Sequence, residues 1–247
     1  MKIGLFVPCY VDALHPEVGI ATLELLERFG LDVVYPPNQT CCGQPMSNTG
    51  CEEEARATEA LFVKNFSGFD YVVAPSGSCV RQVRDYLTAV EQTPEVLHLR
   101  KTTFELVEFL HDVLKVDAFP WAEFPHRVAI HNNCGALRGL RIASMSERRE
   151  PFFSKPKALL SKVSGIEFCD LERPDECCGF GGTFSVFEEG ISAKMGQDKV
   201  EDQIGSGAEY VTSSDSSCMM HQEGCARRMG ADLKYIHIAQ ILNGNAA

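Results

Sequence analysis

The 247-residue sequence lacks long apolar runs and carries few cationic side chains for its length. Nowhere do 18 apolar residues stand together, so no transmembrane helix is expected. The opening stretch MKIGLFVPC is too short for the apolar core of a signal peptide and has no small-residue cleavage site. Lys and Arg number 23 against 34 Asp and Glu, and the net charge of −11 disfavours binding to nucleic acid or anionic lipid. We therefore expect a cytoplasmic protein with no nucleic-acid partner and no direct membrane insertion.

The sequence also lacks any Cys-x-x-Cys spacing, although it contains 11 cysteines. An apolar content of 45% is enough to bury a core without disulfide staples. In a reducing compartment, many cysteines indicate metal or redox chemistry rather than structural disulfides. The odd count agrees, because at least one thiol must stay unpaired within the chain.

Short apolar or β-branched runs alternate with helical patterns along the chain. The predicted strands are residues 2–9, 32–35, 71–74, 96–99, 127–131, 165–171, 210–213 and 234–238, and two of the predicted helices are 19–29 and 103–114. This alternation predicts an α/β fold with small, mainly parallel sheets flanked by helices.

The cysteines repeat in the same order in the two halves of the chain. Cys9 corresponds to Cys134, and the motif "CCG" occurs at 41–43 and again at 177–179. The segment "PSGSC" that ends at Cys79 corresponds to "SDSSC" that ends at Cys218, and "LHL" at 97–99 corresponds to "IHI" at 236–238. We interpret this as two pseudo-symmetric repeats, residues 1–122 and 123–247, joined by a linker near 117–126 that is rich in proline and aromatics. The alternative is one continuous sheet with coincidental cysteine spacing.

Each repeat offers four thiols at or just beyond the carboxyl ends of its predicted strands, the edge at which open α/β sheets bind ligands. They are Cys9, Cys41, Cys42 and Cys79, then Cys134, Cys177, Cys178 and Cys218. Thiolates are the ligands of iron–sulfur clusters and of zinc. Adjacent cysteines bind one zinc ion poorly, and structural zinc sites prefer Cys-x-x-Cys, so an iron–sulfur cluster is favoured. A vicinal disulfide would leave the other thiols unexplained.

Glycines accompany the vicinal cysteines. Gly43, Gly179, Gly181 and Gly182 permit positive φ and close approach of backbone N–H groups to cluster sulfur. A flexible turn is the alternative for "GFGG".

The remaining cysteines and histidines have simpler expected roles. Cys169 is expected in the core, and Cys51 and Cys225 have no counterparts in the other repeat. His98 and His237 are expected to be core residues that occupy equivalent positions. His131, just before Cys134, is expected to orient a neighbour in the site rather than to bind metal.

At these residues the sequence resembles the cysteine-rich CCG-domain proteins, whose pattern is Cys, a gap, Cys-Cys-Gly, a similar gap and Cys-x-x-Cys. That family includes the catalytic subunit of heterodisulfide reductase and iron–sulfur subunits of glycolate and glycerol-3-phosphate dehydrogenases. Here Gln82 and His221 stand where the last cysteine of each pattern would be. The resemblance implies one or two [4Fe–4S] clusters per chain, cubane or noncubane, with the second repeat the better candidate for loading. His221 offers a nitrogen ligand in place of the missing sulfur.

Longer segments resemble the lactate utilisation protein A group, among them "HPEVGIATLELLERFGLDVVYPPNQTCCGQP", "ECCGFGGTFSV" and "HIAQIL". This resemblance implies an electron-transfer subunit of an L-lactate dehydrogenase complex, working with an iron–sulfur protein and a third small subunit. "GFGGTF" is not a dinucleotide fingerprint, so we do not expect the chain to oxidise lactate alone. The alternatives are a cluster-dependent thiol–disulfide reductase, a non-redox zinc scaffold, and a partner-binding subunit with vestigial thiols.

Overall fold

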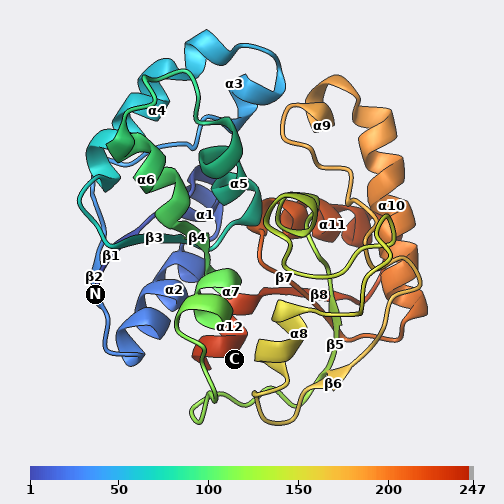
Figure 1. Cartoon of the computed structure of the whole chain (residues 1–247). Coiled ribbons are helices and arrows are strands. Elements are labelled where there is room, and N and C mark those ends of the chain that lie inside the picture. The colour runs from blue at the N-terminus through green and yellow to red at the C-terminus, as the bar shows by residue number, and fades with distance from the viewer. Residues whose placement is uncertain (245–247) are drawn as a thin grey trace.

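Two four-stranded parallel sheets form the framework of the protein (Figure 1). The computed structural model describes residues 1–244. The strand order is β2-β1-β3-β4 in the first sheet and β6-β5-β7-β8 in the second, and neighbouring strands within each sheet run parallel. The predicted α/β fold with two repeats is therefore confirmed.

Helices connect successive strands and cover the sheets (Figure 1). The first half contains β1 (Lys2–Leu5), α1 (Cys9–Leu14), α2 (Pro16–Arg28), β2 (Asp32–Val34), α3 (Gln44–Asn48), α4 (Glu52–Phe66), β3 (Tyr71–Ala74), α5 (Gly77–Tyr86), α6 (Pro94–Thr102), β4 (Thr103–Glu105), α7 (Leu106–Glu108) and the π-helical turn η1 (Phe109–Val113). The second half contains β5 (Arg127–Ile130), the π-helical turn η2 (Gly135–Leu140), α8 (Lys155–Leu160), β6 (Glu167–Phe168), α9 (Phe184–Phe187), α10 (Glu189–Gly205), β7 (Tyr210–Ser213), α11 (Ser216–Met229), β8 (Lys234–His237) and α12 (Ile238–Asn243).

The strand register shows which residues of the paired strands β1 and β3 correspond to residues of β5 and β7. Ile3 pairs with Tyr71 in the first sheet, as Val128 pairs with Tyr210 in the second. Both β1 and β5 are followed by one further backbone hydrogen bond to the neighbouring strand, from Phe6 to Val73 and from His131 to Thr212. Position 6 of the first half therefore corresponds to position 131 of the second.

One predicted strand, residues 96–99, is wrong. These residues belong to helix α6, which begins where the Thr93 hydroxyl accepts a hydrogen bond from the N–H of Val96 and where Pro94 fits the first helical position. Val96 and Leu99 are buried three positions apart, the spacing of one face of a helix. An apolar run this short is compatible with either a helix or a strand in the sequence.

The fourth strand of the first sheet lies instead at β4, in a segment that the sequence pattern predicts to begin a helix. Glu105 ends β4 and caps α7, just as His237 ends β8 and caps α12. The predicted equivalence of His98 and His237 is therefore wrong: Glu105 is the counterpart of His237, and His98 is exposed on α6. The predicted strands at 2–9 and 165–171 are also shorter in the structure.

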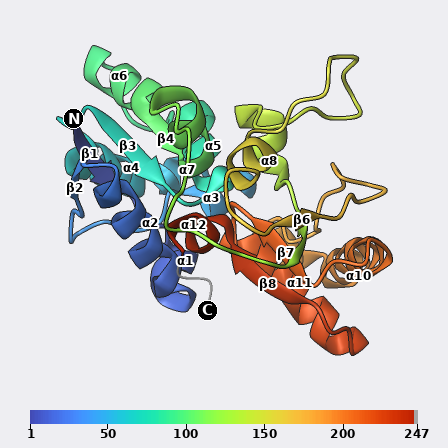
Figure 2. The same ribbon diagram turned by 90° about the horizontal axis from the view of Figure 1, so that it is seen from below.

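The two halves share one apolar core. This core contains Ile3 and Leu25 from the first half together with Val128 and Ile241 from the second. The C-terminal helix α12 packs against α2 of the first half (Figure 2). Residues 117–126 form no regular helix or strand, as predicted for a linker, but Phe119 and Phe124 are buried within the core. The boundary between 122 and 123 stays a prediction.

Two side-chain hydrogen bonds also join α12 to the first half of the chain. The indole N–H of Trp121 donates to the carbonyl of Leu242 at 3.0 Å, and the amide of Asn243 donates to the carboxylate of Glu24 at 2.7 Å. Of the helices among residues 1–244, none has the length and apolarity needed to cross a membrane.

Candidate metal centre

The first four cysteines lie where the strand order of the first sheet reverses. Cys9 begins α1 after β1, and Cys79 lies in the first turn of α5 after β3. Cys41 and Cys42 lie in the loop that follows β2. Ligands of open parallel sheets bind at such a switch point, because the connections on either side of it diverge to opposite faces and leave a crevice.

The second four cysteines occupy the equivalent places. Cys134 lies at the N-terminus of η2 after β5, Cys218 in the first turn of α11 after β7, and Cys177 and Cys178 in the loop after β6. Cys79 and Cys218 thus occupy the same place, the first turn of the helix that follows the third strand of each half.

The two sets open into a single pocket. All eight predicted cysteines line it, together with the aromatic rings of Tyr10 and Phe180 and the side chain of Val186. The structure thus brings together the thiols that the sequence grouped, and it places the two groups side by side. Whether each thiol is a ligand stays a prediction.

The buried carboxylate of Asp215, which itself lines the pocket, joins the two halves. One oxygen accepts hydrogen bonds from the hydroxyl of Ser76 and the N–H of Ser78, at 3.2 and 3.0 Å. The other accepts from the N–H and the hydroxyl of Ser217, at 3.2 and 2.6 Å. One side chain therefore fixes the starts of α5 and α11, and with them the positions of Cys79 and Cys218.

Close packing at Gly77 complements this link. A Cβ atom on Gly77 would lie 2.5 Å from the Cβ of Ala136 and within 2.9 Å of the Asn133 side chain. Glycine at the start of α5 thus allows η2, which follows Cys134, to approach the helix that carries Cys79.

The first set of thiols holds one stabilised thiolate. Hydrogen bonds from the thiols of Cys42 and Cys9, and from backbone N–H groups that include Gly43, lower the pKa of Cys41 to about 3. The pKa values of Cys9 and Cys42 are raised, first because their thiols donate to Cys41 and then because they are buried. Gly43 has φ of 90°, a left-handed conformation that suits glycine in the turn after the cysteine pair.

The second set repeats this pattern. Hydrogen bonds from the thiols of Cys134 and Cys178, and from the N–H of Gly179 at 3.4 Å, lower the pKa of Cys177 to about 2. The pKa values of Cys134 and Cys178 are raised for the same reason as in the first half. Each half thus has one sulfur ready to bind a metal and further thiols that would release protons on binding.

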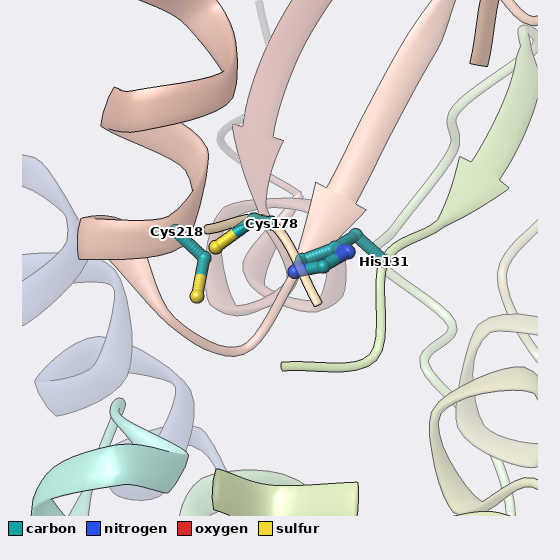
Figure 3. Close-up of side chains that lie close together, drawn as sticks. All are labelled: His131, Cys178 and Cys218. Atoms are coloured by element: carbon teal, nitrogen blue, oxygen red, sulfur yellow. The ribbon is translucent and has the colours of Figure 1, made fainter. Parts of the chain in front are cut away.

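His131 lies beside two sulfurs of the second set, although it does not line the shared pocket. Its side chain is 1% exposed, and neither ring nitrogen has a hydrogen-bond partner. A ring nitrogen and the sulfurs of Cys178 and Cys218 lie within 4.8 Å of one another (Figure 3). Burial lowers the pKa of His131 to about 3, so the ring is neutral. From the sequence, His131 was expected near the site but only in an orienting role.

The other polar candidates lie elsewhere. His221 does not line the shared pocket, and its Nε2 lies 3.1 Å from the carbonyl of Ser192. Gln82 is buried on α5 and does not line the pocket either. The expectation that Cys169 is a core residue is wrong: it lies half-buried after β6, because that strand ends at Phe168, and it lines a separate pocket. Cys51 is exposed and Cys225 is half-buried.

Comparison with known proteins agrees with this arrangement. The family model of the CCG cysteine-rich domain matches residues 3–84 and 128–222, so the chain belongs to that family. The two matched segments carry the two cysteine sets.

Full-length relatives narrow the assignment to the Lactate utilization protein A family, to which the chain belongs. The protein of that name from Oceanobacillus iheyensis is 38% identical over 98% of this chain and 97% of its own length. The one from Exiguobacterium sp. is 40% identical over 98% and 97%. Among solved structures, glutamate racemase RacE1 from Bacillus anthracis covers 98% of this chain and 78% of its own, at 10% identity and a TM-score of 0.36, which identifies neither fold nor function.

The donor set fits a thiophilic metal group. Each half offers four clustered thiols, one of them stabilised as a thiolate, and the second half adds a buried imidazole without a partner. Soft sulfur and borderline nitrogen are the ligands that iron–sulfur clusters and zinc prefer. The clustered cysteines of this family member therefore indicate metal or iron–sulfur binding.

Proposed function

We propose that the protein is a cytoplasmic iron–sulfur electron-transfer subunit of a multi-protein system that oxidises L-lactate to pyruvate. The observation that carries the proposal is the shared pocket, lined by all eight cysteines of the two repeats. The names of the full-length relatives support a role in lactate utilisation.

In this proposal each repeat holds one [4Fe–4S] cluster. Cys9, Cys41, Cys42 and Cys79 would bind the first, and Cys134, Cys177, Cys178 and Cys218 the second. Such a cluster supplies one-electron redox chemistry when it is bound. Because Gln82 and His221 do not line the pocket, four thiols per repeat support a cubane cluster over a noncubane one.

The chain's own groups would prepare the site for an anionic cluster. Backbone N–H groups at Gly43 and Gly179 donate to the sulfurs of Cys41 and Cys177. The rings of Tyr10 and Phe180, with centroids 5.5 Å apart, cover part of the site.

Lactate oxidation releases two electrons and two protons, and we assign that step to partner subunits. The proposed partners are an iron–sulfur protein and a third small subunit. Exposed apolar side chains on α9 and the start of α10 support a partner contact there: Val186, Phe187 and Ile191 are 73%, 72% and 56% exposed. Val186 itself lines the pocket, so a partner on this surface would lie directly over the cysteines.

Anaerobic purification with iron and sulfide analysis and EPR tests the proposal. We expect bound iron and sulfide in equal amounts and an EPR signal that L-lactate elicits only when the partner subunits are present. A colourless protein that contains zinc and no iron would overturn the electron-transfer function.

A second candidate function is reduction of disulfides by the cluster. The apolar lining of the pocket, which includes Pro8, Val11 and Pro45, supports it because a small substrate could lie between the two cysteine sets. Disulfide reduction by the reconstituted protein, without lactate-linked electron transfer, would favour this function over the first.

A further inference from the structure

The two repeats differ at one buried position beside their cysteines. Phe6 and His131 are equivalent, because each directly follows the first strand of its sheet and donates its N–H to the same position of the neighbouring strand. Phe6 packs edge-on against Phe62 and Phe66, with ring centroids 5.1 and 5.5 Å apart. The first repeat thus shows that the fold accepts an apolar ring here.

The surroundings of His131 are polar where those of Phe6 are apolar. The strand register equates Thr212 and Ser213 in the second repeat with Val73 and Ala74 in the first. Both ring nitrogens of His131 are buried without a hydrogen-bond partner, and so is the hydroxyl of Ser213, whose counterpart Ala74 packs in the same apolar cluster as Phe6. Unpaired buried polar groups destabilise a fold, so the ring of His131 calls for a ligand that the protein atoms do not supply.

No described side chain provides that ligand. The nearby ammonium group of Lys199 is fully buried but is bonded to the carbonyl of Arg173 and lies 3.3 Å from the carboxylate of Asp202. One ring nitrogen of His131 instead lies on the side that faces the sulfurs of Cys178 and Cys218 (Figure 3).

We infer that the imidazole of His131 is a nitrogen donor to the metal group of the second repeat, beside Cys178 and Cys218, whereas the first repeat binds through sulfur alone. A mixed nitrogen and sulfur set suits iron in a cluster and also a single zinc ion. The iron form of this inference rests on the proposed function. Ligation by His131 itself does not.

Pulsed EPR on the reduced, anaerobically purified protein tests the iron form. We expect a ¹⁴N coupling to the cluster that becomes a ¹⁵N coupling when histidine is ¹⁵N-labelled. The coupling should disappear in His131→Gln and in His131→Phe, which introduces the ring present in the first repeat. His221→Gln is the matched control and should retain the coupling. His221 lies one turn beyond Cys218, but its Nε2 lies 3.1 Å from the carbonyl of Ser192, whereas a ring nitrogen of His131 lies within 4.8 Å of the sulfurs of Cys178 and Cys218.

Cobalt titration of the apoprotein tests the zinc form. Co²⁺ bound by thiolates and imidazole absorbs in the visible range, and the band should shift and the affinity fall at least tenfold in His131→Gln but not in His221→Gln.

The outcomes separate the two proposals. Normal iron content without a histidine coupling overturns ligation by His131 and leaves the electron-transfer function standing. Zinc or Co²⁺ bound through His131 in a protein that never takes up iron supports the ligation and overturns electron transfer. A coupling or cobalt spectrum that His131→Gln leaves unchanged overturns the ligation even if His131→Phe fails to fold.

Discussion

Single sulfur atoms differ sharply within each vicinal cysteine pair. The first cysteine of the pair accepts hydrogen bonds and is held as a thiolate, whereas the second is buried and donates. Metal binding by Cys42 and Cys178 would therefore release protons.

Replacing Cys178 by alanine tests the ligand set. We expect Cys178→Ala to lose the metal of the second repeat, so that iron and sulfide per chain fall by about half if both repeats are loaded. Cys169→Ala is the control, since Cys169 lies outside the shared pocket, and it should keep full metal content. Equal metal content in the two variants would contradict a ligand role for Cys178.

Glu105 makes stability depend on pH. Burial raises the pKa of its carboxyl to about 8, while the ordinary value is 4.5. Between these values the folded protein holds a proton that the unfolded chain has lost, so the free energy of unfolding should fall as pH rises, by about 1.4 kcal/mol per pH unit. Glu105→Gln keeps an acceptor for the N–H groups of Val107 and Glu108 and should remove this slope.

Urea unfolding of both proteins at pH 5.5, 6.5 and 7.5 measures the difference. Other titrating groups, including Glu108, are common to the two proteins and cancel in the comparison. Parallel pH profiles would mean that Glu105 is ionised in the fold.

The repeated cysteine pattern is the part of the site that the sequence predicts most fully. Both repeats contain their four thiols in the same order, and the structure brings the eight together around one pocket. Their role as ligands stays a prediction. The repeat gives no signal for His131, because its counterpart is Phe6. The family pattern offers His221 as a possible nitrogen ligand, and in the structure its Nε2 lies 3.1 Å from the carbonyl of Ser192.

Among the secondary-structure elements, the start of α5 has no room for a side chain larger than glycine at position 77. Gly77→Ala would place a methyl group 2.5 Å from Ala136, and we expect it to destabilise the fold by about 1–3 kcal/mol and to lower metal occupancy. Gly224→Ala in α11 is the matched control, because no atom lies within 4 Å of its added Cβ. That change should be neutral or stabilise by up to about 1 kcal/mol. Thermal unfolding and metal analysis of both variants check the contrast.

The elements that the sequence misassigned are short ones. β4 has three residues and leads directly into α7, so its one apolar side chain, Phe104, fits the helical pattern that follows. The preceding α6 was taken for a strand because the run at 96–99 is apolar, although Thr93 and Pro94 are a typical helix start. Longer elements such as α2 and α4 have enough turns for their periodicity to decide the assignment.

At the scale of the whole molecule, the exposed apolar side chains of α9 are the surface that we expect to bind a partner subunit. The double variant Val186→Asp, Phe187→Asp should weaken binding to the iron–sulfur partner subunit at least tenfold while metal content stays unchanged, because charged groups would replace exposed apolar contacts. Leu97→Asp is the control: Leu97 is 43% exposed on α6 and does not line the pocket. Pull-down and titration calorimetry measure the affinities, and equal binding by all three proteins would place the contact elsewhere.

The position of α12 also makes the two halves depend on each other for stability. Helix α12, Ile238–Asn243, belongs to the second half, yet it covers α2 of the first. A chain cut before Ile238 is therefore expected to leave an apolar face of α2 uncovered and to destabilise the first cysteine set as well as the second.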